Sequence, residues 1–309
     1  MNWTAKDIPS QTGRRALITG ANSGIGFHAA LELARRDAEV ILPARSEEKA
    51  QDAVRRIHAE VPQAKLIPAI LDLASQASIR AFGSFIDQHF PGASIDILIN
   101  NAGVMAIPKR ELTADGFERQ FATNFLGPFA LTGLIFPHLK PQAGTRIVTL
   151  ASIVVHGAQI LFDNLQSERK YVPLYGAYSQ SKLADLIFAF ELQRRLEAIG
   201  STITSIAAHP GIATTNLQSN MTGLYKIIGP LLTPLTGQSA AQGALPELFA
   251  AASPAATPGG YYGPNGAGER KGYPSLAKVP DTAKNTSIAH RLWTTAEQLT
   301  GVYFPRPAS

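Results

Sequence analysis

Two patterns of hydrophobic and polar positions alternate along the chain from about residue 14 to residue 210. Short runs of β-branched and aliphatic residues, with the length of buried strands, are separated by longer stretches in which apolar residues recur every three or four positions. This order is typical of a parallel sheet that is covered by helices on both faces. The strands we expect are Ala16–Thr19, Val40–Leu42, Leu66–Leu71, Ile95–Asn100, Arg146–Leu150 and Ile203–Ala207. The helices we expect between them are Gly24–Arg36, Glu47–Glu60, Ser75–Gln88, Asp115–Leu139 and Tyr178–Ile199.

The unbroken alternation leaves no place for a domain boundary. We therefore expect residues 1–309 to form a single α/β domain of the Rossmann type, with a doubly wound parallel sheet and helices on both faces. Past residue 210 the pattern weakens, and the apolar segment 212–237 is interrupted by glycine and proline. This segment is either a flap over a substrate or an ordinary surface segment. A final strand is expected near Gly260–Tyr262, and the tail 263–309 is expected to be irregular.

Composition narrows the class of protein. A hydrophobic fraction of 45% with 17% charged residues is that of a soluble globular chain. The chain has no cysteine, which excludes disulfides and thiolate chemistry. Its polar N-terminus lacks the apolar run of a secretory signal or membrane anchor, so we expect a cytoplasmic protein without stable membrane insertion.

The charged residues and the histidines point to no further partner. The net charge of +5 comes from basic residues scattered along helices, which indicates solvated helix faces rather than a nucleic-acid surface. The seven histidines are dispersed and form no ligand pattern, so we expect no metal site.

A glycine-rich turn lies between the first expected strand and the first expected helix. Residues 19–26 read Thr-Gly-Ala-Asn-Ser-Gly-Ile-Gly. Glycines at such a junction let the backbone approach a pyrophosphate, and the free N–H groups at the helix start favour its negative charge. The turn therefore predicts a dinucleotide site, with a purely structural turn as the alternative. The expected contacts are Gly20, Asn22, Ser23, Gly24, Ile25 and Gly26.

The end of the second strand carries information about the cofactor. A carboxylate there would bind the ribose hydroxyls and exclude a 2′-phosphate, but this chain has Pro43-Ala44-Arg45-Ser46. A guanidinium can bind a phosphate with two parallel hydrogen bonds. We therefore expect Arg45 to favour NADP(H), with NAD(H) as the alternative. Stacking of Arg45 on the adenine, or its exposure to solvent, is the competing interpretation.

Together, the ordered motifs of the chain resemble the short-chain dehydrogenase/reductase family over nearly its whole length. They are Thr19–Gly26, Asp72–Leu73, Asn100–Gly103, Asn124, Ser152, Tyr178–Lys182 and Pro210–Gly211. The Thr-Gly-x-x-x-Gly-x-Gly spacing argues against the epimerase-type branch. The stretch between Ser152 and Tyr178 resembles the branch of retinol dehydrogenases and protochlorophyllide reductases, a resemblance that does not fix a substrate.

The resemblance implies a reaction that needs a proton as well as a hydride. A phenol moves that proton near neutral pH only if a positive charge stabilises its phenolate form. Lys182 lies one helical turn beyond Tyr178 on the same face, so its ammonium is placed to do so. In the family the lysine also binds the nicotinamide ribose, the serine corresponding to Ser152 orients the substrate oxygen, and the asparagine corresponding to Asn124 orders a water that links the lysine to solvent.

The remaining motifs imply further contacts with the cofactor. Asp72 and Leu73 are expected against the adenine, Asn101, Ala102 and Gly103 along the cofactor, and Pro210, Gly211 and Thr214 at the rim beside the nicotinamide, with Tyr178 and Lys182 also in contact.

The function that these residues imply is an NADP(H)-dependent interconversion of a ketone or aldehyde and an alcohol, of the carbonyl reductase or alcohol dehydrogenase kind. The expected substrate is small and largely apolar, because the segment after Ser152 is apolar. Two alternatives stay open: a non-catalytic NADP(H)-sensing or scaffolding protein on the same fold, and an interfacial retinol- or lipid-type dehydrogenase. Family members commonly pair through the helices corresponding to Asp115–Leu139 and Tyr178–Ile199, which would give a homodimer or homotetramer.

Overall fold

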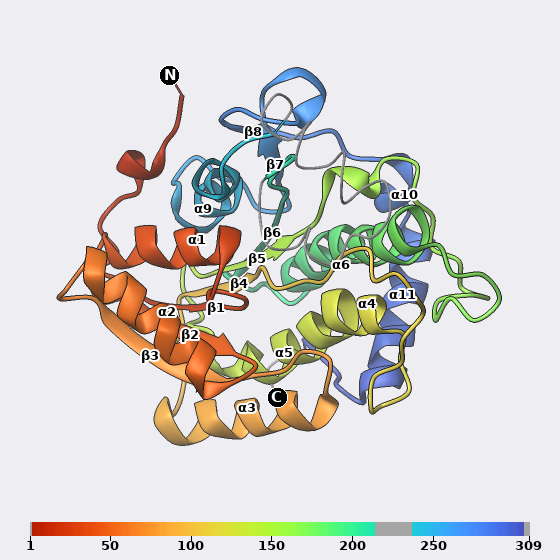
Figure 1. The fold of residues 1–309 in the computed structure, drawn as a ribbon, viewed down its shortest axis with the longest axis horizontal. Coiled ribbons are helices and arrows are strands. Elements are labelled where there is room, and N and C mark those ends of the chain that lie inside the picture. The colour runs from red at the N-terminus through yellow and green to blue at the C-terminus, as the bar shows by residue number, and fades with distance from the viewer. Residues whose placement is uncertain (1, 214–236, 306–309) are drawn as a thin grey trace.

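The protein is built on one central sheet, seen in a computed structural model that describes residues 2–213 and 237–305 (Figure 1). The strand order within these residues is β3-β2-β1-β4-β5-β6-β7-β8, and all neighbours are parallel except the last pair. The α/β fold with a doubly wound, mostly parallel sheet is confirmed. The strands are β1 Arg15–Ile18, β2 Glu39–Ala44, β3 Lys65–Ile70, β4 Ile97–Asn100, β5 Arg146–Leu150, β6 Thr204–Ala208, β7 Tyr261–Pro264 and β8 Pro274–Leu276.

Between β1 and β4 the strand order reverses direction. The chain builds outward from β1 through β2 to β3, and then returns to the other side of β1 to continue with β4. At such a switch point the loops after the two strands diverge and leave a crevice at the carboxyl edge of the sheet. The glycine-rich turn follows β1 and the Asn101–Gly103 segment follows β4, so the fold brings these two motifs to the same crevice.

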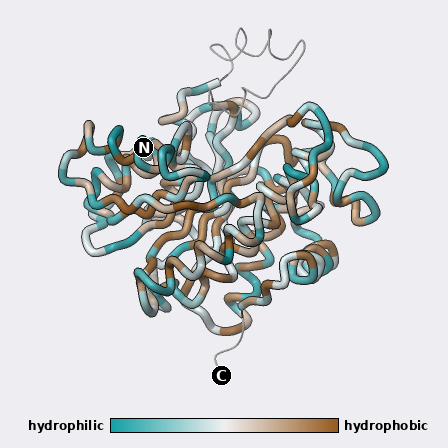
Figure 2. Tube along the Cα trace, turned by 60° about the horizontal axis from the view of Figure 1, so that its bottom comes forward, coloured by the Kyte–Doolittle hydropathy of each residue, from teal (hydrophilic) through white to brown (hydrophobic). Residues whose placement is uncertain are grey.

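Two hydrophobic cores lie on the two faces of the sheet. Alternate residues of each strand point to opposite faces, so Leu17 of β1 joins one core while Ala16 and Ile18 join the other. Figure 2 shows the hydrophobic strands running through the middle of the molecule. Helices α3 (Gln76–His89), α5 (Gly127–Ile135), α6 (Ser179–Ala198) and α11 (Thr286–Thr300) cover the first face. Helices α1 (Gly24–Ala34), α2 (Glu47–Glu60) and α9 (Leu245–Ala252) cover the second. Because both faces are buried, the strands are apolar runs rather than alternating ones, as the sequence pattern predicts.

The helices of the first half follow the sequence closely. Helix α2 has both ends where the pattern predicts them, because Ser46 caps it and accepts a hydrogen bond from the Lys49 N–H at 3.4 Å. The described helices are α1 Gly24–Ala34, α2 Glu47–Glu60, α3 Gln76–His89, α4 Arg119–Phe121, α5 Gly127–Ile135, α6 Ser179–Ala198, α8 Ala240–Gly243, α9 Leu245–Ala252, α10 Asp281–Lys284 and α11 Thr286–Thr300.

The helix expected over Asp115–Leu139 is shorter and less regular than predicted. It begins only at Arg119, because the buried Glu118 carboxylate caps it by accepting hydrogen bonds from two N–H groups of the first turn. Residues Ala122–Leu126 then form a π-helical segment before α5 starts. A second π-helical segment, Pro173–Tyr178, opens α6. Asn124 and Tyr178 lie in these two segments, and π-helical turns are frequent at functional sites.

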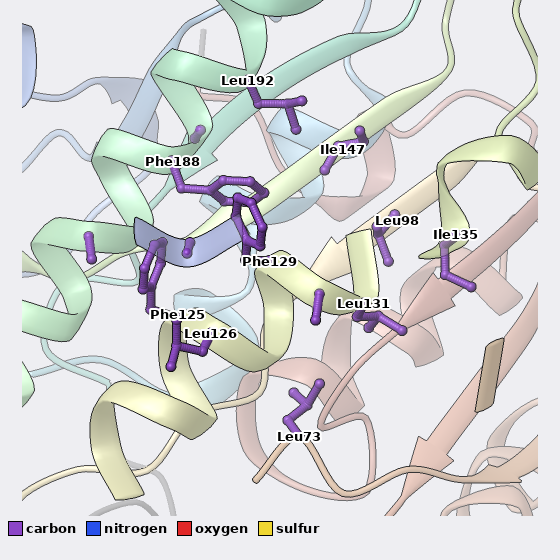
Figure 3. Close-up of a cluster of buried hydrophobic side chains, with 14 of the residues drawn as sticks. Leu73, Leu98, Phe125, Leu126, Phe129, Leu131, Ile135, Ile147, Phe188 and Leu192 are labelled. Carbon is purple, nitrogen blue, oxygen red and sulfur yellow. The ribbon is translucent and has the colours of Figure 1, made fainter. Parts of the chain in front are cut away.

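The prediction of an irregular tail over 263–309 was wrong for much of its length. After β8, residues Thr286–Thr300 form α11, which Asn285 caps through hydrogen bonds from two N–H groups. Its amphipathic spacing buries Trp293 against Phe129 of α5 and Phe188 of α6, with ring centroids 5.0 and 5.7 Å apart. Figure 3 shows Phe129 and Phe188 in this core. The tail therefore completes the first core.

Helix α11 packs on the two helices through which pairing is expected, and the expected homodimer or homotetramer stays a prediction. The faces of α5 and α6 that bear Phe129 and Phe188 are covered by α11 and by Phe304 of the same chain.

Most of the expected flap 212–237 lies outside the described residues. In the described part of the chain, no helix has the length and apolar character that crossing a membrane requires.

Candidate active site

The glycine-rich turn has the backbone conformation that its sequence implies. Gly20 and Gly24 have φ of 71° and 58°, in the left-handed region that favours glycine. Ser23 adopts extended backbone as the N-cap of α1, while the N–H groups of the helix start have no intrahelical partner. The expected contact residues Gly20–Gly26 thus lie at the amino end of a helix facing the crevice, and they fit the pyrophosphate of a dinucleotide.

The turn is held by the segment that follows β4. The Thr19 hydroxyl accepts hydrogen bonds from the N–H groups of Asn101 and Ala102 at 3.1 and 3.0 Å, and the Asn101 amide donates to the Thr19 carbonyl at 2.7 Å. A Cβ on Gly26 would overlap this amide and lie 2.7 Å from the Gly20 carbonyl oxygen. Asn101 and Gly26 therefore fix the shape of the turn as well as lining the crevice.

Arg45 lies directly after β2 with its side chain exposed. Within the described residues it has no hydrogen bond or ion pair, so its guanidinium is available to a ligand. Asp72 also has a structural role, and its expected contact with the adenine stays a prediction. Its carboxylate accepts a hydrogen bond from the Ala74 N–H at 3.0 Å, and its own N–H donates to Ser78, so it shapes the turn into α3. Leu73 beside it is buried.

Lys182 joins α6 to the end of β5. Its ammonium donates to the Leu150 carbonyl at 2.7 Å and to the Asp185 carboxylate at 2.8 Å, and its side chain is almost fully buried. Burial alone would lower the pKa of Lys182, but the charge of Asp185, with smaller contributions from Tyr178 and Glu247, raises it overall. The lysine therefore stays charged. With two of its three N–H groups used, one remains for a ligand.

Tyr178 and Ser152 lie next to this lysine. Tyr178 is one helical turn before Lys182 and is 5% exposed. In the described residues its hydroxyl has no hydrogen-bond partner, which leaves it free for a substrate. Ser152 follows β5, and its hydroxyl accepts only a long bond of 3.4 Å from Val154. The fold thus brings Ser152, Tyr178 and Lys182 to the carboxyl end of β5.

Asn124 is placed beside Lys182 by its π-helical turn. Its amide accepts from the Val104 N–H at 2.8 Å and donates to the Val104 carbonyl and to Ser181 at 3.0 and 2.8 Å. A Cβ on Gly103 would lie 3.2 Å from the Asn124 oxygen and 3.6 Å from the Lys182 nitrogen. Gly103 therefore leaves room where Asn124 and Lys182 approach each other, and the side chain of Asn124 clamps the chain after β4.

The rim formed by Pro210 and Gly211 depends on a contact that sequence reasoning missed. His209 is fully buried, accepts from the Gly211 N–H at 3.2 Å and shares a hydrogen bond of 2.9 Å with Glu269. Burial would raise the pKa of Glu269, but the bond from His209 and one from the Lys278 N–H lower it overall. The rim is thus tied to a loop 60 positions later. Thr214 lies outside the described residues.

Apolar side chains collect on the segment that leads to Tyr178. Leu161, Val172 and Tyr175 are exposed and line a hollow of about 260 Å³, whose lining also includes polar side chains such as those of Asn164 and Lys170. Val155, in contrast, is fully buried and belongs to the core. The apolar character of the segment after Ser152 therefore has two origins, since part of it is packing and part of it is exposed surface.

Two buried carboxyl groups near Lys182 were also missed. Asp185 is 1% exposed and its second oxygen has no hydrogen-bond partner among the described residues. Glu247 on α9 is fully buried, and neither of its oxygens has a partner there. A single sequence carries little signal for either residue, because Asp and Glu on a helix are ordinarily solvated.

The fold and this crevice define an α/β protein of the dinucleotide-binding class. Residues 14–223 match the family model described as short chain dehydrogenase, and the chain belongs to this family of oxidoreductases. Retinol dehydrogenase 13 from Homo sapiens is 38% identical over 301 residues, covering 95% of this chain and 86% of that protein. Polyprenol dehydrogenase from Mus musculus is 37% identical over 301 residues, covering 95% and 86%.

Solved structures agree with the fold. The crystal structure of an uncharacterised protein from Mycobacterium paratuberculosis has a TM-score of 0.81 and 38% identity, covering 99% of this chain and all of that chain. A short chain dehydrogenase from Burkholderia cenocepacia in complex with NADP has a TM-score of 0.62 at 24% identity, covering 81% and 95%. The resemblance to the retinol dehydrogenase branch is therefore confirmed.

Proposed function

We propose that this protein is an NADP(H)-dependent dehydrogenase/reductase that interconverts an apolar alcohol and its aldehyde or ketone, with Tyr178 as the general acid and base. The observation that carries the proposal is the position of Tyr178. Its free hydroxyl lies one turn from a buried, charged lysine at the carboxyl end of β5, beside a serine whose hydroxyl is almost unengaged.

The chain's own residues have separate tasks in this reaction. When bound, the nicotinamide supplies or accepts the hydride. The charge of Lys182 stabilises the phenolate form of Tyr178, so that the hydroxyl gives a proton to the substrate oxygen in reduction and takes one in oxidation. Ser152 holds that oxygen by a hydrogen bond. Lys182 binds the ribose with its remaining N–H group, and Asn124 maintains the chain after β4 next to the lysine.

The preference for NADP(H) rests on Arg45. Its exposed guanidinium directly after β2 is the group that a 2′-phosphate on the adenosine ribose would meet, and the residues around it, Pro43-Ala44-Arg45-Ser46, offer no carboxylate to the ribose hydroxyls. Arg45→Ala is expected to weaken NADPH binding by roughly tenfold to a hundredfold, since a hydrogen bond to a charged group contributes about 1.5–3 kcal/mol, while NADH binding changes little. Cofactor fluorescence titrations measure both, and an equal loss for both would contradict the assignment.

The proposed substrate class follows from the exposed apolar side chains and from the relatives. Leu161, Val172 and Tyr175 give the segment before Tyr178 an apolar surface. Two of the relatives are named for retinol and polyprenol, both of which are apolar alcohols. We expect activity with long apolar alcohols and aldehydes to exceed that with short polar ones.

The decisive experiment compares the wild type with Tyr178→Phe. Cofactor oxidation and reduction are followed with a panel of apolar aldehydes and alcohols. The variant should lose at least a hundredfold in kcat, because general acid–base catalysis contributes about 10²–10⁴-fold, while it still binds NADPH. Turnover that survives the substitution would refute the role of Tyr178, and a wild type without turnover on any substrate would refute the proposed activity.

A further inference from the structure

The ammonium of Lys182 is shared between two groups behind the site. One is the Leu150 carbonyl at 2.7 Å, and the other is the Asp185 carboxylate at 2.8 Å. The side chains of Lys182 and Asp185 are 5% and 2% exposed, so water screens their interaction weakly. The charge that the proposed reaction needs at Tyr178 is therefore already engaged by a buried carboxylate three positions farther along α6.

Only one of the two carboxylate oxygens of Asp185 has a hydrogen-bond partner among the described residues. Its Oδ2 holds Lys182, while its Oδ1 is buried and has no hydrogen-bond partner among the described residues. An ionised carboxylate in such a place is costly unless several donors surround it, and here one donor group serves it. The structure thus gives Asp185 a site in which the neutral and the ionised forms compete closely.

We propose that Asp185 is a positioning residue that sets how much of the Lys182 charge reaches Tyr178, and that it does so through its own state of ionisation. With Asp185 neutral and Lys182 still protonated, the full positive charge of Lys182 stabilises the Tyr178 phenolate. With Asp185 ionised, the pair is close to neutral overall, and the phenolate loses that support. The inference rests on the proposed function of Tyr178.

The size of the effect of the Asp185 charge on Tyr178 follows from the separation of the two residues along the helix. Asp185 lies about two helical turns beyond Tyr178, which is roughly 10 Å along the axis. At an effective dielectric constant of about 20, a unit charge at this distance shifts the ionisation of a neighbouring group by about one pH unit, or about tenfold in the ratio of its two forms.

The surrounding ionisable groups support a transition near neutrality. Burial raises the pKa of Asp185 to about 7, although the charge of Lys182 pulls it down. Lys182 is the ionisable group among the described residues that acts on Asp185. Tyr178 and, from α9, Glu247 also act on Lys182, and Tyr261 of β7 interacts with Tyr178. Burial raises the pKa of Glu247 to about 8, so Glu247 is mostly neutral where Asp185 titrates.

The test is the pH profile of kcat/KM for alcohol oxidation in the wild type and in Asp185→Asn. The amide keeps the shape and an oxygen for Lys182 but carries no charge. The two profiles should coincide below about pH 7, and above it the variant should exceed the wild type by up to about tenfold. A loss by the same factor at every pH would show a structural role only, and superimposed profiles over the whole range would also overturn the proposal.

Two further measurements keep the outcomes distinct. Glu247→Gln is the matched control, and its profile should follow the wild type up to about pH 8. The second is the tyrosinate absorbance of the cofactor-free protein, titrated as the difference between wild type and Tyr178→Phe and repeated in the Asp185→Asn background. The midpoint of this difference titration should lie about one pH unit lower in the Asp185→Asn background than in the wild type. An unchanged midpoint would refute the coupling between Asp185 and Tyr178, even if the protein turns over no substrate. Asp185→Thr removes the charge with a smaller side chain if the amide prevents folding.

Discussion

The buried carboxyl of Glu247 makes stability depend on pH in a way that one substitution can isolate. Neither of its oxygens has a hydrogen-bond partner among the described residues, and burial raises its pKa from 4.5 to about 8 despite the charge of Lys182. The folded protein therefore holds a proton that the unfolded chain has released. The contribution of the Glu247 proton to the free energy of unfolding is therefore fully present below about pH 4.5, and it is lost as the pH rises toward 8.

The size of this loss follows from the shift. Each pH unit between the two pKa values costs about 1.4 kcal/mol, so the wild type loses about 3 kcal/mol from Glu247 between pH 4.5 and pH 7 and about 4 kcal/mol by pH 8. Asp185 adds a loss of the same sign that ends near pH 7, where burial places its pKa. Glu247→Gln removes the first loss and leaves the second.

Urea unfolding at pH 5, 7 and 8.5 measures the effect. The free energy of unfolding of Glu247→Gln should rise relative to the wild type by about 3 kcal/mol from pH 5 to pH 7 and by about 1 kcal/mol more from pH 7 to pH 8.5. Asp281→Asn is the control, because the side chain of Asp281 is 99% exposed and the substitution should give the same small difference at every pH. A constant difference between Glu247→Gln and the wild type across the range would refute the reasoning.

Two other substitutions test the turn and the C-terminal helix. Gly26→Ala should cost about 1–3 kcal/mol and weaken NADPH binding, because its Cβ would overlap the Asn101 amide. Gly83→Ala, whose nearest contact would be 3.5 Å from Leu134, should instead gain about 0.5–1 kcal/mol without changing cofactor affinity. Thermal unfolding and cofactor titration check both, and equal effects at the two glycines would contradict the assignment. Trp293→Ala should lower the free energy of unfolding by about 3–5 kcal/mol, as measured by urea unfolding. It should also promote self-association by uncovering α5 and α6, as measured by sedimentation. A variant that stays as stable as the wild type would be inconsistent with this role of α11.

The positions of most strands and of the glycine-rich turn were predictable because they depend on local patterns. Buried parallel strands are short apolar runs, and capping residues such as Ser46 mark helix starts directly in the sequence. The same holds for Tyr178 and Lys182, whose spacing of one helical turn is visible without coordinates. These features are fixed by residues that lie close together along the chain.

The parts that were not predictable depend on contacts between distant segments. The start of the long helix is set by Glu118, an acid buried by packing, and no nearby apolar pattern announces it. Helix α11 carries local signals, the Asn285 cap and an amphipathic spacing, but the surface on which it packs, formed by Phe129 and Phe188, lies more than a hundred positions before Trp293. The buried states of Asp185 and Glu247, and the bond between His209 and Glu269, arise in the same way. For Glu118, Asp185 and Glu247, tertiary burial changed the chemistry of a residue type that is usually solvated.

The hydrogen bonds from the segment after β4 to Thr19 have a consequence for how this protein acquires its cofactor crevice. The partners are 82 and 83 positions apart, so the glycine-rich turn alone does not contain the information for its own shape. A growing chain that has emerged only through β3 carries every glycine of the motif but neither the Asn101 amide nor the wall opposite. The turn takes its shape only when β4 lies beside β1, so the glycines of the motif alone do not make a nucleotide site.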